Sequence, residues 1–273
     1  MKLSITFEQF MKYKSVNHDM LSQLRSFANN LNYKQKKRPL KNKWNKNEPI
    51  EINWMMKKKY DNSESENLQS QIKGLLNKLA LNNFNDILIE FNKIQEEILT
   101  YDDLNFLVHL IFNKAVRETK FCELYANLCK GLLNIKILFN DKQIKFREIL
   151  LKYCQKSFYE NISYNKDDDN IDLFYIKGKI LGCIKFIGEL YNLNIIPHKV
   201  IVACFNDLIS HVNKNIYMVD SICCLMMTCG LKMSKCNPND VNILFNKFNF
   251  LKKSISLPEK FALMDLDDIK NKW

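Results

Sequence analysis

Apolar residues recur at helical spacing along the region Leu68–Lys270. The stretch Lys177–Leu193 is the clearest case, because Ile180, Ile184 and Ile187 fall on one stripe that must be buried. Only six glycines and five prolines occur among 273 residues, which disfavours a turn-rich all-β fold. The pattern therefore predicts the all-α class.

Turn residues divide this region into ten predicted helices. Breaks are expected at Asn82–Asn83, at Lys166–Asn170 and at Pro197, Pro238 and Pro258. The helices are expected near residues 68–80, 84–99, 102–117, 120–135, 141–162, 171–193, 197–213, 215–231, 238–252 and 257–270. Because one pair of amphipathic helices cannot bury both of its stripes, the sequence predicts a solenoid of about five antiparallel pairs, preceded by an extended N-terminal segment.

A second face of the stretch Lys177–Leu193 carries Gly178, Gly182, Lys185 and Glu189. Glycine costs about 1 kcal/mol in a helix interior relative to alanine, so these glycines indicate the close approach of another helix or of a partner. Lys185 and Glu189 are spaced i,i+4. They form either a solvated ion pair or a charged contact on a docking surface.

Most of the net charge of +11 lies in the segment Lys34–Lys59, which has ten Lys and Arg against Glu48 and Glu51. Trp44 and Trp54 are interleaved with these charges. Aromatic rings among cations are typical of single-stranded RNA binding, because a ring can stack on a base while the cations hold phosphates. The alternative is a solvated linker whose charge is incidental. The candidate RNA-binding residues are Lys36, Lys37, Arg38, Lys41, Lys43, Lys57, Lys58 and Lys59.

The first 31 residues also have apolar positions at helical spacing, but they are too few to form a core. Such a segment usually docks on a partner, although it can also pack on its own domain. The candidate contact residues are Ile5, Phe10, Met11, Met20, Leu21 and Leu24.

Recognisable catalytic and cofactor motifs are missing from the sequence. It contains neither GxxxxGK nor GxGxxG, and its four histidines lack metal-ligand spacing, so we expect each at the surface or core edge. The nine cysteines indicate reduced thiols, with Cys223, Cys224, Met226 and Met227 in the core. We therefore expect no enzyme activity, no cofactor and no metal. A signal peptide and a membrane span are not expected either.

Four ordered segments resemble one known family. KGKILGCIKFIGELYNLNII, which begins at Lys177, resembles the signature helix of the middle, helicase-binding HEAT domain of eukaryotic translation initiation factor 4G. Gly74–Phe91, Leu104–Leu132 and Pro258–Trp273 are similar to its first two helix pairs and its closing helix. The resemblance implies that residues 68–273 are a HEAT-repeat domain, after a peptide at 1–33 and a basic linker at 34–67.

The same resemblance suggests partners. The segment Ile5–Lys14 is similar to the peptide that binds the cap-binding factor 4E, with Ile5 in place of its tyrosine and Phe10 in place of its leucine. In the family a tryptophan ahead of the HEAT domain packs on a helicase of the 4A type, which makes Trp44 the first candidate and Trp54 the second. The helicase site carries over to Lys114, Arg117, Glu118, Phe121, Lys185 and Glu189.

These features together predict a cytoplasmic translation-initiation scaffold that joins a cap-binding protein, a DEAD-box helicase and mRNA, with ribosome-bound initiation factor 3 as a further partner. Ordinary factor 4G is much longer, with a poly(A)-binding-protein site and further HEAT domains, and both would be missing if these 273 residues were the complete protein. Heavy use of Asn, Lys and Ile indicates an AT-rich genome, of a protist or a large virus. The alternatives are a HEAT-domain adaptor in nuclear RNA processing or decay, and a repressor that sequesters the helicase.

Overall fold

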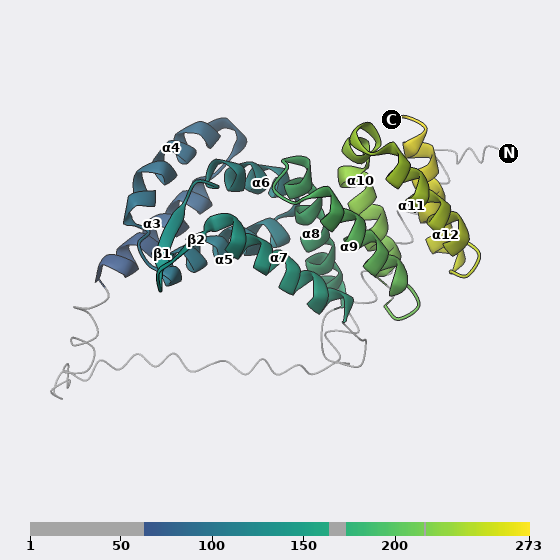
Figure 1. Ribbon diagram of the computed structural model, residues 1–273, viewed down its shortest axis with the longest axis horizontal. Helices are drawn as coiled ribbons and strands as arrows, with labels where there is room; N and C mark the ends of the chain where they lie inside the picture. Colours follow the sequence, from purple (N-terminus) through teal and green to yellow (C-terminus); the bar gives the residue numbers. More distant parts are fainter. Residues whose placement is uncertain (1–62, 164–172, 216) are drawn as a thin grey trace, which may run out of the picture. The chain divides into compact units, whose positions relative to one another are not determined.

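The computed structural model describes residues 63–163, 173–215 and 217–273 (Figure 1). Ten α-helices occupy most of these residues, which confirms the predicted all-α class. Their bounds are α3 Ser63–Lys78, α4 Phe84–Ile94, α5 Tyr101–Arg117, α6 Cys122–Gly131, α7 Phe146–Ile162, α8 Leu173–Asn192, α9 His198–Ser210, α10 Met218–Cys236, α11 Pro238–Leu251 and α12 Leu257–Lys270.

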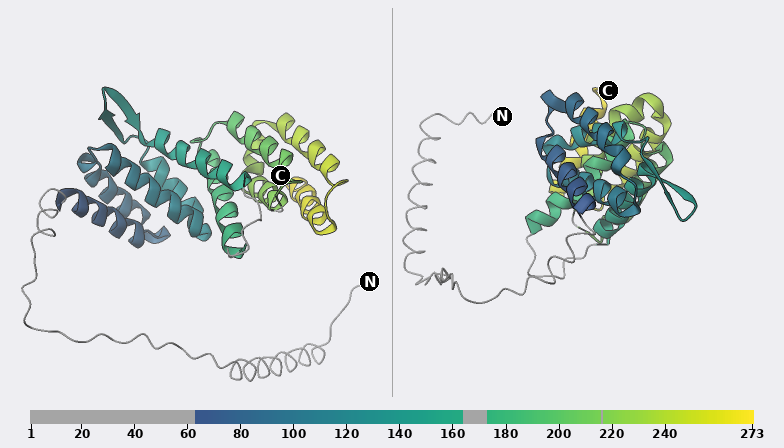
Figure 2. Two further views of the ribbon diagram at one scale, coloured as in Figure 1. Left: turned by 90° about the horizontal axis from the view of Figure 1, so that it is seen from below. Right: turned by 90° about the vertical axis from the view of Figure 1, so that its left-hand side faces the viewer.

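The helices form two layers, as expected of stacked pairs. In one layer α3 contacts α5 and α5 contacts α7, while α9 contacts α11. In the other layer α6 contacts α8, α8 contacts α10, and α10 contacts α12 (Figures 1 and 2). Helix α8 also packs against α5, so it is the element that joins the first helix pairs to the last. One continuous apolar core runs between the layers, with Phe91, Phe112, Phe186, Phe205 and Phe248 among its large side chains.

Local sequence chemistry sets several helix ends. The hydroxyl oxygen of Thr100 accepts a hydrogen bond from the backbone N–H of Asp103 (3.1 Å), which caps the start of α5. Ser256 and Glu259 form a capping box at the start of α12. Between α8 and α9, Asn194 takes a positive φ of 62°, a conformation that asparagine tolerates better than most residues. The predicted starts of the two capped helices, at 102 and 257, lie within one residue of the observed starts of α5 and α12, whereas the predicted starts at 68 and 141 differ from those of α3 and α7 by five residues.

One element was not predicted: a β-hairpin between α6 and α7 (Figure 2). Its strands, β1 Lys136–Phe139 and β2 Lys142–Lys145, pair antiparallel with Ile137 opposite Ile144. The predicted helices at 120–135 and 141–162 are therefore wrong at the ends that adjoin it. Asn140 and Asp141 both have positive φ, as the tight turn of a two-residue hairpin requires. Alternating apolar residues around this Asn-Asp pair were the signal that the helical interpretation overlooked.

Candidate functional site

The end of α5 and the face of α8 that carries Gly182 meet at a very close contact. A Cβ added to Gly182 would lie 2.0 Å from the carbonyl oxygen of Val116, so only glycine fits there. Gly188 is also crowded, since an added Cβ would lie 2.8 Å from the Thr228 methyl group on α10. The predicted close approach is therefore confirmed at Gly182 and extends to Gly188. No other helix approaches Gly178, which has no atom within 4 Å of the added Cβ, so the approach of a partner there stays a prediction.

Glu118 is held by two side chains at the C-terminal end of α5. Its carboxylate accepts hydrogen bonds from Lys114 Nζ (3.0 Å) and from the hydroxyl of Tyr125 on α6. Burial opposes ionisation of Glu118, but these two hydrogen bonds prevail and lower its pKa below the ordinary value. The hydrogen bond from Tyr125 to Glu118 thus spans the turn between α5 and α6, and Lys114 helps to hold the carboxylate in place.

Lys185 and Glu189 do not pair with each other. Lys185 Nζ instead donates to the carbonyl oxygen of Thr119 (2.9 Å) and ties α8 to the turn that follows α5. Burial raises the pKa of Glu189 above its ordinary value, against a hydrogen bond from the Asn192 amide (3.3 Å). Lys185 therefore positions the turn, while Glu189 is a carboxylate whose charge is poorly solvated.

Two of the predicted residues remain on the surface. Arg117 is exposed, and among the described residues its side chain has no hydrogen bond or ion pair. Phe121, in the short 3-10 helix Thr119–Phe121, is 47% exposed. Arg117 and Phe121 thus form the exposed rim of the candidate site, and Lys114, Glu118 and Lys185 form its internal frame.

An open cavity of about 570 Å³ extends the site from α8 onto α10. Lys185 and Glu189 line it together with Met227 and Thr228, and an ion pair between Lys177 and Asp220 crosses its edge. The prediction that Met227 lies in the core is wrong, because its side chain is exposed. Met227 belongs to this surface, and the buried Tyr125 belongs to the frame behind it through its hydrogen bond to Glu118. Sequence reasoning missed both as site residues. Because Tyr125 lies on α6 and Glu118 follows the end of α5, helical spacing gave no signal for their contact.

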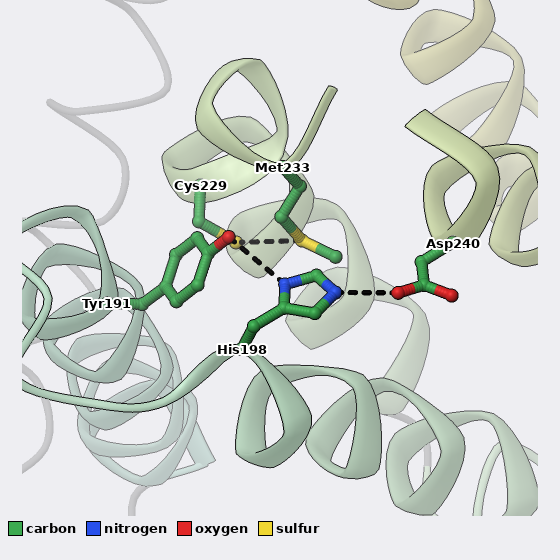
Figure 3. A network of polar contacts seen from close by, with 5 residues as sticks. All are labelled: Tyr191, His198, Cys229, Met233 and Asp240. Carbon is green, nitrogen blue, oxygen red and sulfur yellow. Dashed lines mark hydrogen bonds and ion pairs between the residues drawn. The ribbon is translucent and has the colours of Figure 1, made fainter. Parts of the chain in front are cut away.

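A second polar network lies where α8, α9 and α11 meet (Figure 3). His198 contacts the hydroxyl of Tyr191 through Nδ1 (3.2 Å) and the carboxylate of Asp240 through Nε2 (2.7 Å). Burial raises the pKa of Tyr191 to about 12, so its phenol stays protonated near neutral pH. His198 lies partly buried at the core edge, as predicted, and links three helices.

The chemistry of the described residues is that of contacts between helices. Burial raises the pKa of Cys122, Cys204 and Cys223 to about 12, which keeps these thiols protonated and weakly nucleophilic. All nine cysteines are free thiols. Within residues 63–163, 173–215 and 217–273, no three His, Cys, Asp or Glu side chains converge to hold a metal ion. No helix in those ranges is long and apolar enough to cross a membrane.

The remaining predicted contact residues lie outside the described ranges. They are the cap-binding-factor residues Ile5, Phe10, Met11, Met20, Leu21 and Leu24, the tryptophans Trp44 and Trp54, and the basic residues Lys36, Lys37, Arg38, Lys41, Lys43, Lys57, Lys58 and Lys59. The site on the helical stack therefore consists of α5, the turn after it, α8 and α10.

Comparison with known proteins agrees with this architecture. The family model of the MIF4G domain matches residues 69–272. Eukaryotic translation initiation factor 4G of Triticum aestivum is 28% identical over 252 residues, which cover 82% of this chain and 17% of that protein. Eukaryotic translation initiation factor 4 gamma 1 of Mus musculus is 27% identical over 245 residues, which cover 77% of this chain and 15% of that protein. The chain thus spans about one-sixth of the length of these relatives.

A solved structure supports the fold independently. The crystal structure of the MIF4G domain of Trypanosoma cruzi translation initiation factor EIF4G5 aligns with a TM-score of 0.52 and 19% sequence identity. The alignment covers 76% of this chain and 97% of that one. At this identity the likeness supports the stacked helix pairs.

Proposed function

The chain belongs to the MIF4G domain family, and from this premise we propose that it is a non-enzymatic translation-initiation scaffold of the cytoplasm. It bridges a cap-binding protein of the factor 4E type and a DEAD-box helicase of the factor 4A type, and it contacts mRNA. Similarity to initiation factors from plants, animals and fungi supports the initiation role. The scaffold acts by raising the effective concentration of its partners and by favouring one conformation of the helicase.

The rim at Arg117 and Phe121 is the observation that supports the helicase site. A half-exposed phenylalanine and an exposed arginine at the same helix end are typical of an interface, since aromatic residues and arginine are enriched at interface cores. The turn that carries them is fixed by Lys185 on one side and by Glu118 on the other. A fixed turn presents the rim without a large entropic cost on binding.

Binding of the helicase tests this site. We expect Phe121→Ala combined with Arg117→Gln to weaken affinity for a factor 4A helicase by about thirtyfold or more, because truncation of even one hot-spot residue costs about 2 kcal/mol or more. Isothermal calorimetry on the full chain measures the loss. Phe250→Ala, at another exposed phenylalanine on α11, serves as the matched control. Equal affinities for the double variant, the control and the unmodified chain would show that the helicase does not bind at this surface.

Binding of a cap-binding protein by the N-terminal peptide distinguishes the proposed scaffold from a helicase-sequestering repressor and from an adaptor in RNA processing or decay. If Ile5–Met11 captures a cap-binding protein, Phe10→Ala with Met11→Ala abolishes that interaction and leaves helicase binding intact. A chain that binds the helicase without any cap-binding protein would act as a repressor. Failure to bind either partner would favour an adaptor in RNA processing or decay.

The basic linker is the proposed site for the message. The logarithm of RNA affinity falls with the logarithm of salt concentration by about 0.7 per phosphate neutralised, so engagement of about half of the linker cations gives a slope near −3 to −4. Replacing Lys36, Lys37, Arg38 and Lys41 with glutamine should flatten that slope, whereas Lys185→Gln should leave it unchanged. An unaltered slope in the four-residue variant would identify the linker as a solvated tether.

A further inference from the structure

A smaller cavity opens beside the junction of α8, α9 and α11. It encloses about 310 Å³, at the lower end of the range of about 300–1,000 Å³ that is usual for ligand sites. Pro197 and Asn237, the residues that precede α9 and α11, both line it, and no side-chain hydrogen bond caps the start of either helix. Because the first N–H groups of a helix and its dipole favour negative charge, two uncapped helix starts at one cavity indicate an anion.

Arg147 of α7 brings a fixed positive charge to this cavity. Its Nε and Nη2 donate to the carbonyl oxygen of Ile195 at 3.0 and 2.7 Å, so the guanidinium is held against the connection between α8 and α9. A guanidinium has five N–H groups, and these two bonds use two of them. Arg147 is exposed and has no other hydrogen bond or ion pair within the described part of the chain. The remaining N–H groups are therefore a rigid set of donors for an anion.

Lys232 of α10 adds a second positive charge. Its Nζ donates to two carbonyl oxygens at the end of α8 and to the amide oxygen of Asn194 (2.6 Å), all of which are neutral groups. Burial lowers the pKa of Lys232, as expected of an ammonium without a carboxylate partner. None of the described residues that line the cavity is acidic, and the carboxylate of Asp240 is bound to His198 (Figure 3). Lys232 thus contributes charge, and Arg147 contributes both charge and free donors.

We propose that this cavity binds the phosphate group of a phosphorylated serine or threonine side chain in a partner protein. A phosphate monoester carries a charge of about −1.5 to −2 near pH 7, which matches the two cations. Its three acceptor oxygens match the free N–H groups of Arg147 and of the two helix starts. The small volume suits one such side chain rather than a larger cofactor.

Other anions fit this cavity less well. Single-stranded nucleic acids are held by exposed aromatic rings that stack on bases, and the described lining has none. The ring of Tyr191 is buried with Lys232 Nζ 4.7 Å from its centroid, and the side chain of His198 is only 23% exposed. A carboxylate has one charge and two oxygens, so an acidic peptide would use the site in part. The site goes beyond the proposed function, because it adds a partner whose binding depends on phosphorylation.

Cys236 is a natural reporter for this site, because it lines the cavity and is the exposed one of the nine cysteines. The full chain is treated with iodoacetamide, and mass spectrometry follows the alkylation of Cys236 and of the partly exposed Cys223. The probe is a pool of short peptides with one central phosphoserine and randomised flanks. We expect the pool to slow alkylation of Cys236 in a saturable manner and to leave that of Cys223 unchanged, whereas the same pool with serine slows neither. Equal rates at Cys236 with the two pools would overturn the proposal.

Variants separate binding from folding. Arg147→Gln should weaken binding of the phosphoserine pool about ten- to hundredfold, as expected for the loss of charge-assisted hydrogen bonds. Because Arg147 also supports the connection between α8 and α9, Asn237→Asp is the second variant. Aspartate is as good a first residue for α11 as asparagine, so the fold should be kept while the added charge repels the phosphate. Ser256→Asp makes the same kind of change at the start of α12 and should have no effect.

The Asn237→Asp variant keeps the proposal falsifiable even if Arg147→Gln unfolds. Unchanged binding of the phosphoserine pool by a folded Asn237→Asp chain would refute the anion site. Helicase affinity of this variant should equal that of the unmodified chain, so a failure of this site is distinguishable from a failure of the proposed function.

Two competitors identify the source of the phosphate. Inorganic phosphate should protect Cys236 less than the peptide pool does, and equal protection would assign the cavity to the free ion and overturn the protein partner. A short oligouridylate should also protect Cys236 less than the pool. Stronger protection by the oligouridylate that is lost in Arg147→Gln would assign the cavity to nucleic acid and overturn the proposal.

Discussion

The two polar junctions of the helical stack use similar residue types in different ways. At the junction of α8, α9 and α11, the polar groups bind one another: His198 lies between Tyr191 and Asp240 (Figure 3), and Lys232 donates to the carbonyl oxygens of Tyr191 (2.7 Å) and Asn192 (3.0 Å). At the junction of α5 and α8, only the inner groups are paired. Arg117 and Phe121 remain exposed there.

This difference separates a stabilising network from a binding surface. A paired network holds helices in register and leaves few groups for a partner. A surface for binding needs exposed groups on a frame that does not move, which the hydrogen bond from Lys185 to Thr119 provides. Substitutions at the first junction should therefore act on stability, and those on the rim of the second should act on binding.

The glycines of α8 give the largest expected effect. Gly182→Ala places a methyl group against the Val116 carbonyl, which belongs to the backbone and cannot rotate away. We expect a loss of about 3 kcal/mol in the free energy of unfolding, at the upper end of the usual cost of overpacking. Gly178→Ala is the matched control, since it enters open space and gains up to about 1 kcal/mol in helix propensity. Denaturant unfolding with an unchanged m-value measures both, and equal stabilities would refute the close contact.

Lys232 gives the next largest effect, at the paired junction. Lys232→Met keeps the aliphatic stem but removes the donor to two carbonyl oxygens at the end of α8, so we expect a loss of about 1–2 kcal/mol. Lys247→Met removes a lysine whose Nζ, within the described part of the chain, donates only to the amide oxygen of the exposed Asn206. That control should change stability by less than about 0.5 kcal/mol. A Lys232 variant as stable as the control would contradict the role of the network.

Sequence periodicity was enough to predict the ten helices, because stripes at Ile180, Ile184 and similar positions report burial directly. It did not predict the hairpin at Lys136–Lys145, whose short alternating strands were absorbed into neighbouring helices. Periodicity also placed Lys185 and Glu189 next to each other on one face of α8, but it did not identify the groups to which they hydrogen-bond. Thr119 lies 66 residues from Lys185, and the contact depends on how closely α5 and α8 pack.

The smallest effect we expect is a pH dependence of stability at the junction of α5 and α8. Glu118 and Glu189 both lie there, and their ionisation changes the free energy of unfolding in opposite directions. Hydrogen bonds from Tyr125 and Lys114 outweigh burial and lower the pKa of Glu118, so its contribution to stability is present above the ordinary pKa of 4.5 and is lost as pH falls through the folded value. Burial raises the pKa of Glu189, so its ionisation destabilises the fold as pH rises from 4.5 through its folded value.

Near pH 7, Glu118→Gln should therefore destabilise the protein by about 0.5 kcal/mol, a small value because the carboxylate is 40% exposed and screened. Glu189→Gln should stabilise it at the same pH. The Glu189→Gln difference should vanish well below pH 4.5, where that carboxyl is protonated in the folded and the unfolded state, and the Glu118→Gln difference should shrink as the pH falls through the lowered folded pKa of Glu118. Unfolding curves at pH 7 and at a series of lower pH values measure the differences. If the two variants shifted stability in the same direction near pH 7, the two carboxylates would have similar environments. The distinction between Glu118 in a hydrogen-bonded frame and Glu189 as a poorly solvated carboxylate would then be wrong.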